Sequence, residues 1–203
     1  MDKQESKRRM EIVVEEYDGI LPYCEAFYIH SIIYAAGQAE MAFEGYERAL
    51  RENQAAAIIF SEVQEGLAHS AALSRFFWPV KKENALSDTR GAKLRKAFGL
   101  DDHSPLRGRE LRNAFEHFDE DLDRFLLEND AGYFFPTPMV DDHTLANKPP
   151  GKIFKLVDPA HHICVLLGRK FDFKSIRTEV TKVLNQAIAM DNAGSRLTDP
   201  RKP

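Results

Sequence analysis

Apolar residues recur at three- and four-residue steps through much of the first half of the chain, a spacing typical of helices that bury one face. The first stripe predicts a helix over residues 22–51 with these residues facing the core: Phe27, Ile32, Ala35, Ala39, Ala42, Phe43, Tyr46 and Leu50. A second stripe predicts a helix that Asn53 caps and Pro79 ends, with these inward residues: Ala56, Ile59, Phe60, Val63, Leu67, Ala71 and Phe76. The short connection between the two helices favours antiparallel packing.

Two further helices are indicated by residues that favour helix ends. Asp88 and Gly99 bracket a helix over residues 89–98, because aspartate caps an N-terminus and glycine readily adopts the left-handed conformation that ends a helix. Ser104 followed by Pro105 predicts the start of another helix. The apolar positions of that helix follow a heptad-like spacing and are Leu111, Phe115, Phe118, Leu122 and Phe125.

The pattern changes in the second half of the chain. Glycine and proline residues over 130–151 predict a loop. Two apolar runs, Lys152–Val157 and His162–Leu167, flank the turn-forming segment Asp158–His161 and predict a short antiparallel β-hairpin. A final helix is predicted over residues 174–190, with these residues facing inward: Ile176, Val180, Val183, Leu184 and Ile188.

These elements predict a mainly α fold, an antiparallel helical bundle with a small β-hairpin appendage. A chain of 203 residues, 43% hydrophobic and 30% charged, is long and apolar enough to bury one substantial core. We therefore expect one domain, in which residues 1–129 form the bundle core and residues 130–192 pack on it as loop, hairpin and C-terminal helix. Residues 193–203 are polar and are expected to form a disordered tail.

The charge balance limits the possible partners. A formal net charge of −4 excludes a protein that coats nucleic acid through its bulk charge. Cys24 and Cys164 have no ligand or disulfide spacing, so we expect reduced, buried thiols. The chain shows neither a signal peptide nor an apolar run long enough to span a membrane, and we expect a cytoplasmic protein without membrane contact. One local excess of basic residues indicates either a nucleic-acid surface or a solvated face: Arg90, Lys93, Arg95, Lys96, Arg107, Arg109 and Arg112.

The segment Arg112–His117 carries the clearest chemical signal. Residues four apart share one face of a helix, so Arg109, Asn113 and His117 form a polar stripe distinct from the apolar one. The long side chain of Arg112 can turn its guanidinium toward the same cleft. Asn113 lies one turn before His117, where its amide can hold the imidazole in one tautomer.

Arg112 and Asn113, followed after three residues by His117, resemble the Arg-polar-x-x-x-His motif of the HEPN superfamily. The resemblance covers this motif and the helical layout of residues 22–129, and it implies a HEPN-like antiparallel helical bundle. HEPN proteins include metal-independent ribonucleases, notably toxins of toxin–antitoxin and abortive-infection systems, and also members that have lost catalysis. The resemblance therefore implies an endoribonuclease that acts on RNA without metal or cofactor. It implies Arg112 and His117 as catalytic residues, with Arg109 and Asn113 binding the substrate.

The chemistry of such a site requires no external nucleophile, because the 2′-hydroxyl of RNA attacks the adjacent phosphorus. His117 would act as general acid or base, and Arg112 would neutralise charge that builds on the phosphorane oxygens. One imidazole cannot readily carry out both proton transfers from opposite sides, so we expect a homodimer, the state in which HEPN relatives form their sites. A nucleotidyltransferase-type antitoxin, which silences some relatives, is a further partner that the resemblance implies.

These residues also have a purely structural interpretation. Arg112 with Glu116, and His117 with Asp121, are spaced for surface ion pairs on one helix. In this interpretation Arg109 and Asn113 are ordinary solvated side chains. Under this interpretation the same helix belongs to a noncatalytic interaction or dimerisation module.

A second group of polar residues lies in and near the predicted hairpin: Asp141, Asp142, His143, His161 and His162. These residues lack the paired spacing of zinc sites. We interpret them as solvated loop residues, and the sequence predicts no metal site.

Overall fold

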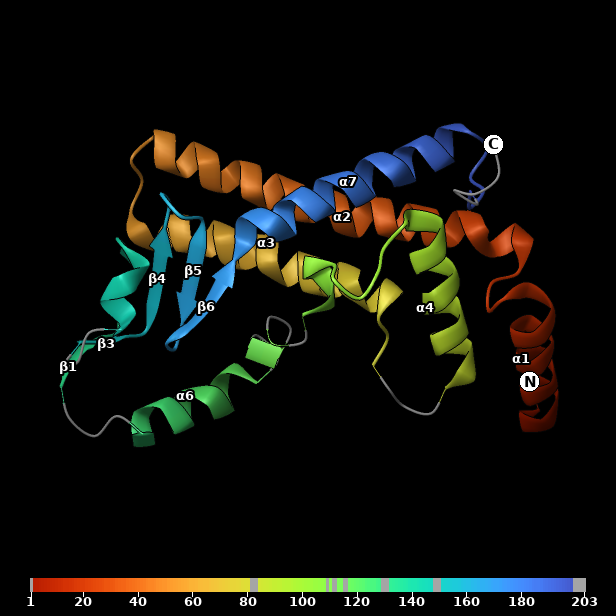
Figure 1. Ribbon diagram of the computed structural model, residues 1–203, viewed down its shortest axis with the longest axis horizontal. Helices are drawn as coiled ribbons and strands as arrows, with labels where there is room; N and C mark the ends of the chain where they lie inside the picture. The colour runs from red at the N-terminus through yellow and green to blue at the C-terminus, as the bar shows by residue number, and fades with distance from the viewer. Residues whose placement is uncertain are drawn as a thin grey trace. The chain divides into compact units, whose positions relative to one another are not determined.

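The computed structural model describes residues 2–80, 84–108, 110, 113–114, 117–128, 132–147 and 151–198. Most residues in this part of the chain are helical, which confirms the mainly α class. The α-helices are α1 Lys3–Tyr17, α2 Glu25–Arg51, α3 Ala56–Phe77, α4 Ala85–Phe98, α6 Phe118–Glu128 and α7 Phe173–Asn192 (Figure 1). Short 3₁₀ segments are η1 Pro22–Cys24, η2 Pro105–Arg107 and η3 His143–Asn147. None of the described helices combines the length and apolar character needed to cross a membrane.

The described residues form two compact units. Unit 1 comprises those of Met1–Gly37, Ala72–Arg107 and Glu179–Pro203, and unit 2 comprises those of Gln38–Ala71 and Gly108–Thr178. Helices α2, α3 and α7 each supply residues to both units. Both units combine segments from either side of residue 129, the position at which we expected the bundle core to end.

In unit 1, α1 packs against α4 through a close backbone approach. Gly19 has a φ of +82°, and a Cβ placed there would lie 2.4 Å from the backbone nitrogen of Arg90, so only glycine fits. Lys93 stabilises the same contact, because its Nζ donates to the carbonyl oxygens of Tyr17 at 3.1 Å and Ile20 at 3.0 Å. No residue of α1 is buried, which explains why this stretch shows no apolar stripe in the sequence.

Unit 2 contains all of the described β-structure. One sheet has the strand order β2-β4-β5-β6, in which β2 runs parallel to β4 and the other neighbours are antiparallel. Strands β1 and β3 form a separate parallel pair. The strands are β1 Tyr133–Phe135, β2 Met139–Val140, β3 Gly151–Ile153, β4 Lys155–Asp158, β5 Ile163–Leu166 and β6 Arg169–Asp172. Figure 1 shows β4, β5 and β6 side by side, with β6 leading directly into α7.

This sheet extends beyond the two strands predicted from the sequence. β4 and β5 pair antiparallel on either side of residues 159–162, with Val157 opposite Cys164. The predicted strand Lys152–Val157 is divided between β3 and β4, which belong to different sheets. β2 has two residues and β6 has one buried residue, Phe171, so neither shows the alternation that identifies a strand in a sequence.

The buried faces of the long helices differ from the prediction at a few positions. Phe27 is 72% exposed rather than buried, and the buried apolar residues of α2 begin at Ile29. Ile188, expected to face inward, is also exposed. Cys164 is buried as expected, whereas Cys24 is partly exposed.

Several helix ends also differ from the prediction. Asn53 takes a left-handed φ of 51° after α2 and does not cap α3, which begins at Ala56. The side chain of Asn84 caps α4, four residues before the expected cap Asp88. Gly99 ends α4 with a φ of 60°, as predicted. The helix predicted to begin after Ser104 starts as the 3₁₀ segment η2.

A tight contact in unit 2 makes one glycine-to-alanine substitution destabilising. Gly66 in α3 faces Phe43 in α2, and a Cβ at this glycine would lie 2.7 Å from a ring carbon of that fully buried side chain. In a helix interior alanine is normally more stable than glycine by about 1 kcal/mol. Here the ring would have to move, so we expect Gly66→Ala to lower the free energy of unfolding by about 1–3 kcal/mol.

Gly37 in α2 provides the matched control for this substitution. A Cβ at Gly37 would meet no heavy atom within 4 Å, so Gly37→Ala is expected to raise the free energy of unfolding by about 0.5–1 kcal/mol. Urea denaturation of both variants measures the difference. A stabilising effect of Gly66→Ala would show that Phe43 does not pack closely on α3.

Candidate functional site

The structure describes two of the four residues predicted for the catalytic site. Asn113 and His117 are described, whereas Arg109 and Arg112 lie outside the described residues. The amide of His117 donates to the carbonyl of Asn113 at 2.9 Å, and the amide of Asp121 donates to the carbonyl of His117 at 2.9 Å. Each bond joins residues four apart, the spacing of one helical turn, and His117 lies in the turn that precedes α6. Asn113 and His117 therefore lie one turn apart.

Both side chains line an open cavity of about 480 Å³ in unit 2. One wall is lined by residues between Glu110 and Arg124, which are Glu110, Asn113, His117, Glu120, Asp121 and Arg124. The opposite contribution comes from Arg169, the first residue of β6. The cavity thus combines an imidazole, an amide, carboxylates and two guanidinium groups.

Asp121 is the electrostatic centre of this cavity. Its Oδ1 accepts a hydrogen bond from Arg124 Nη1 at 3.0 Å, and its Oδ2 accepts one from Arg169 Nη1 at 2.9 Å. The Asp121 side chain is only 13% exposed, while both arginines reach the solvent. Each guanidinium carries five N–H donors, and its bond to Asp121 engages one of them. Asp121 therefore ties α6 to β6 and leaves donors on both arginines for a ligand.

His117 is accessible at the edge of the same cavity. Its side chain is 55% exposed, and its Nδ1 lies 3.7 Å from Glu120 Oε2, close enough for an ion pair when the imidazole is protonated. Such an exposed pair contributes little to stability. Asp121, the ion-pair partner considered in the structural interpretation, is bonded to arginines instead. The other pair considered there, Arg112 with Glu116, lies outside the described residues.

Aromatic packing holds the start of α6 in place beside His117. The ring of Phe118 meets the ring of Phe154 edge-on, with centroids 5.7 Å apart. The Nζ of Lys155 lies 5.3 Å from the centroid of each of these rings and 5.4 Å from that of Phe60 in α3. Contacts of a cation with aromatic faces at this distance are attractive. Lys155 therefore links α3, α6 and the residue that precedes β4.

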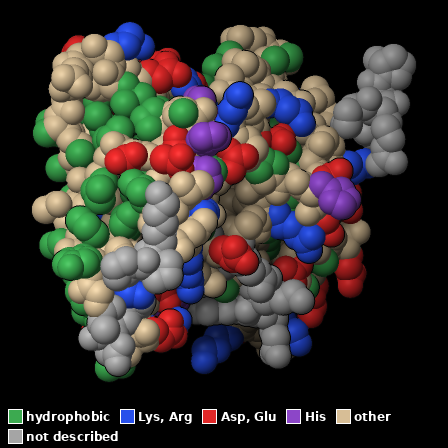
Figure 2. All heavy atoms as spheres, turned by 60° about the vertical axis from the view of Figure 1, so that its left-hand side comes forward, with side chains coloured by type: hydrophobic (Ala, Val, Ile, Leu, Met, Phe, Trp, Pro, Cys, Tyr) green, Lys and Arg blue, Asp and Glu red, His purple; other side chains and the backbone are tan. Residues whose placement is uncertain are grey.

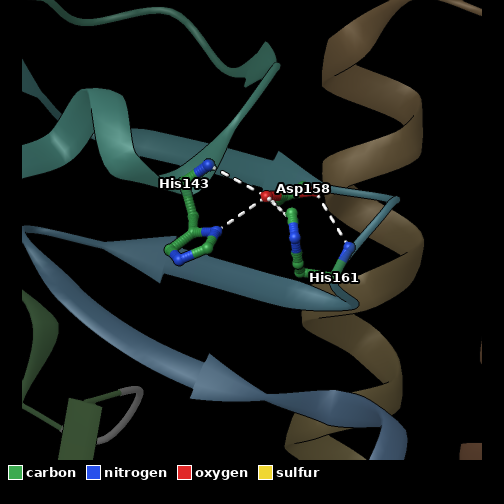
Figure 3. A group of neighbouring side chains, drawn as sticks. All are labelled: His143, Asp158 and His161. Carbon is green, nitrogen blue, oxygen red and sulfur yellow. Dashed lines mark hydrogen bonds and ion pairs between the residues drawn. The ribbon is translucent and has the colours of Figure 1, made fainter.

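A second polar cluster forms where η3 meets the turn after β4 (Figure 3). Asp158 Oδ2 lies 2.7 Å from Nδ1 of His143 and 2.8 Å from Nδ1 of His161. The backbone amide of His143 donates to the same oxygen at 3.0 Å, and the amide of His161 donates to Oδ1 at 3.0 Å. The two imidazole rings meet edge-on, with centroids 5.1 Å apart. We call these three residues the His-Asp-His cluster.

The carboxyl group at the centre of this cluster is almost completely buried. Burial alone would raise the pKa of Asp158, which is 2% exposed, but the hydrogen bonds from His143 and His161 outweigh it and hold the pKa well below its usual range. A carboxylate accepts hydrogen bonds and does not donate them, so Nδ1 of each ring carries the hydrogen.

Burial, with the negative charges of Glu47 and then Asp158, raises the pKa of Tyr46 to about 12.

Two members of this cluster stood out in the sequence, and its centre did not. From the sequence we interpret His143 and His161 as solvated loop residues and Asp158 as the first residue of a turn. The structure contradicts solvation for His143, whose side chain is 19% exposed, whereas His161 is 58% exposed. Asp158 is the last residue of β4, an inner strand of the sheet, and it is buried. His162, which follows directly, has a φ of 57° and packs on Phe173 with ring centroids 5.7 Å apart. The pairing of β2 with β4 brings the segment before His143 next to Asp158, and no sequence spacing reports that contact.

The basic residues of α4 are engaged within unit 1. Lys93 donates to two carbonyl oxygens and pairs with Glu25 at 3.2 Å. Arg95 donates to the backbone carbonyl at the end of α3. Arg107 pairs with Asp102 at 3.3 Å. Lys93 and Arg95 therefore contribute to contacts within unit 1, whereas Arg107 is 50% exposed, and Arg109 and Arg112 of the same basic group lie outside the described residues.

The surface also carries exposed apolar side chains. Figure 2 shows hydrophobic side chains spread over one face of the molecule, beside a group of histidine and acidic side chains. In unit 2 the exposed large apolar residues from α6 to β2 are Leu126, Leu127, Tyr133, Phe134, Phe135 and Val140. All three residues of β1 belong to this set, which we call the apolar surface of unit 2.

Comparison with known proteins adds no relative. No family model, curated protein or solved structure matches this chain. The function therefore has to be inferred from the two polar sites and the apolar surface of unit 2.

Proposed function

We propose that the chain is a metal-independent endoribonuclease of the HEPN type, built on a HEPN-like antiparallel helical bundle and related to toxin or defence systems. His117 acts as general acid or base, and Arg112 stabilises the phosphate. The observation that carries the proposal is the exposed His117 imidazole on a cavity that two guanidinium groups also line. A volume of about 480 Å³ lies within the range of ligand sites, about 300–1,000 Å³.

The reaction requires only groups that the RNA and the chain can supply. The 2′ oxygen forms a bond to phosphorus, and the bond from phosphorus to the 5′ oxygen breaks. One proton leaves the 2′-hydroxyl and one is delivered to the 5′ oxygen, so the products carry a 2′,3′-cyclic phosphate and a 5′-hydroxyl. An imidazole is suited to these transfers because its unperturbed pKa, about 6.5, lies near neutrality.

In the proposal, Arg124 and Arg169 supply positive charge for the phosphate. Arg124 and Arg169 are held 3.0 Å and 2.9 Å from Asp121, which fixes their positions before any substrate binds. A phosphate would receive their remaining N–H groups in addition to the guanidinium of Arg112. In the proposal Asn113 and Arg109, on the same stripe as His117, bind the substrate beside it.

The proposal includes a homodimer. A single imidazole cannot serve the 2′ and the 5′ oxygen at once, because the two protons move on opposite sides of the phosphorus. A two-fold axis would bring a second His117 to the other side and make a composite site. A partner of the nucleotidyltransferase antitoxin type would silence such a site by covering it.

The test is incubation of the wild-type protein with single-stranded RNA in excess EDTA. We expect cleavage products with 2′,3′-cyclic phosphate ends, identified by mass spectrometry. RNA that stays intact at every protein concentration tried would contradict the proposal, and loss of cleavage on adding EDTA would contradict its metal-independent form.

A second candidate is a noncatalytic module that associates with another copy of this chain. The apolar surface of unit 2 favours it, since Leu127 is 83% exposed and Tyr133 is 72% exposed. Large exposed apolar side chains in one region are typical of association surfaces. Under this candidate RNA stays intact while the chain dimerises.

The apolar surface is tested by serine substitutions. We expect Leu127→Ser and Phe134→Ser each to weaken dimerisation at least about tenfold, the effect of losing one well-packed apolar contact. Tyr34→Ser, at a position that is 70% exposed in unit 1, is the matched control and should leave the dimer constant unchanged. Light scattering after gel filtration over a range of protein concentrations measures the constants. Equal constants for all three variants would exclude this surface.

A further inference from the structure

We propose that the His-Asp-His cluster binds a divalent transition-metal ion of the Zn²⁺ class through Nδ1 of His143, Nδ1 of His161 and a carboxylate oxygen of Asp158. Three donor atoms, one from each residue, lie within 4.8 Å of one another. None of the three residues lines the His117 cavity, so the inference does not depend on the proposed ribonuclease.

One oxygen of Asp158 is crowded with donors. Oδ2 of Asp158 faces three N–H groups, the amide of His143 at 3.0 Å and the two ring nitrogens at 2.7 and 2.8 Å. A carboxylate oxygen has about two lone-pair sites, so the three donors compete for them. A metal ion that replaces both ring hydrogens would leave this oxygen with two partners, the ion and one amide.

The donor set is one that binds transition metals. Two imidazoles and one carboxylate bind zinc in catalytic sites, and the same set on one side of a metal binds non-haem iron. Asp158 already directs one oxygen at both ring nitrogens. The two histidines need only move a hydrogen from Nδ1 to Nε2, which is a tautomer change and alters no net charge.

The donor atoms have to separate slightly to hold an ion. Two ligands bonded to zinc at about 2.1 Å in its tetrahedral geometry lie about 3.4 Å apart. The ring nitrogens now lie 2.7 and 2.8 Å from Oδ2, so each separation would have to grow by about 0.6–0.7 Å to admit the ion. His161 is 58% exposed and gives the ion a path from solvent, while His143 is 19% exposed.

The consequence is a cross-link between segments that are distant in the sequence. His143 begins η3, whereas Asp158 ends β4 and His161 lies in the turn between β4 and β5. An ion held by all three would join η3 to the sheet and stabilise the folded state in proportion to its occupancy. The inference therefore assigns the metal a structural role in unit 2.

The experiment compares adjacent histidines. His161→Asn keeps an amide N–H close to the position of the imidazole Nδ1–H, so the bond to Asp158 survives while the metal ligand is lost. His162→Asn is the matched control, because asparagine tolerates the positive φ of His162 and this side chain packs on Phe173 outside the cluster. Circular dichroism verifies that each variant is folded.

Zn²⁺ is titrated into EDTA-treated, buffer-exchanged protein in a calorimeter. We expect one ion per chain, a higher melting temperature with Zn²⁺, and an affinity that falls at least about 100-fold in His161→Asn, since losing even an outer partner of a metal ligand costs about 10–100-fold. His162→Asn should match the wild type. Nitrogen NMR should show both cluster histidines change from the Nδ1–H to the Nε2–H tautomer. Equal affinities in His161→Asn and wild type, no saturable binding, or unchanged tautomers would each overturn the proposal.

Discussion

Replacing His117 by alanine is expected to lower the rate of RNA cleavage by about 10²–10⁴-fold, the usual contribution of proton transfer by a positioned side chain. The imidazole is exposed on the cavity wall, and its two ring nitrogens provide one hydrogen-bond donor and one acceptor. Alanine keeps the backbone hydrogen bonds of this residue, so the loss is expected without unfolding. Initial rates on a labelled single-stranded RNA in EDTA at neutral pH measure the effect.

His103→Ala is the matched control for this prediction. His103 is an exposed histidine in the segment between α4 and η2, and it does not line the cavity. We expect its variant to cleave RNA at the wild-type rate. Equal rates for wild type and His117→Ala would remove His117 from the mechanism, whichever RNA is used.

Replacing Phe173 by alanine is expected to lower the free energy of unfolding by about 3–5 kcal/mol, the range for truncating a buried phenylalanine. Phe173 begins α7 and is buried in unit 2. Its ring lies 6.3 Å from that of Phe43, 5.3 Å from that of Tyr46 and 5.7 Å from that of His162. Truncation would leave a cavity among these rings, because Phe43 and Tyr46 are held on α2 and His162 in the turn before β5, and they cannot all close on it.

Phe27→Ala makes the same chemical change at an exposed position of α2. Because Phe27 is 72% exposed, we expect it to change the free energy of unfolding by less than about 0.5 kcal/mol. Urea unfolding followed by circular dichroism measures both variants. A large loss in Phe27→Ala with little loss in Phe173→Ala would contradict the burial described for these two rings.

Part of the candidate catalytic site follows from the sequence because helical spacing is local. Asn113 and His117 are four residues apart, and the structure places both on one cavity wall. Arg169 contributes to that cavity from β6, 48 residues after its partner Asp121. Nothing in a pattern of three- and four-residue steps reports such a contact, so the ionic part of the cavity could not be predicted.

The His-Asp-His cluster illustrates the same limit at shorter range. His143 and Asp158 are 15 residues apart and meet only because β2 pairs with β4. Spacing rules for metal sites describe ligands on one turn or one helix, and this cluster draws on a 3₁₀ segment, a strand end and a turn. The sequence contains these residues, but their spacing does not predict that they lie together.

By itself, the sequence determined the mainly helical class, the long helices α2, α3 and α7, and the end of α4 at Gly99, because helical periodicity and left-handed glycine caps depend on near neighbours. Tertiary structure alone decided that Phe27 faces solvent, that Asp158 is buried between two imidazoles, and that Asp121 bridges two arginines. Burial and charge pairing depend on which distant segments meet, and hydrophobic contact between those segments selects them only when the whole chain folds.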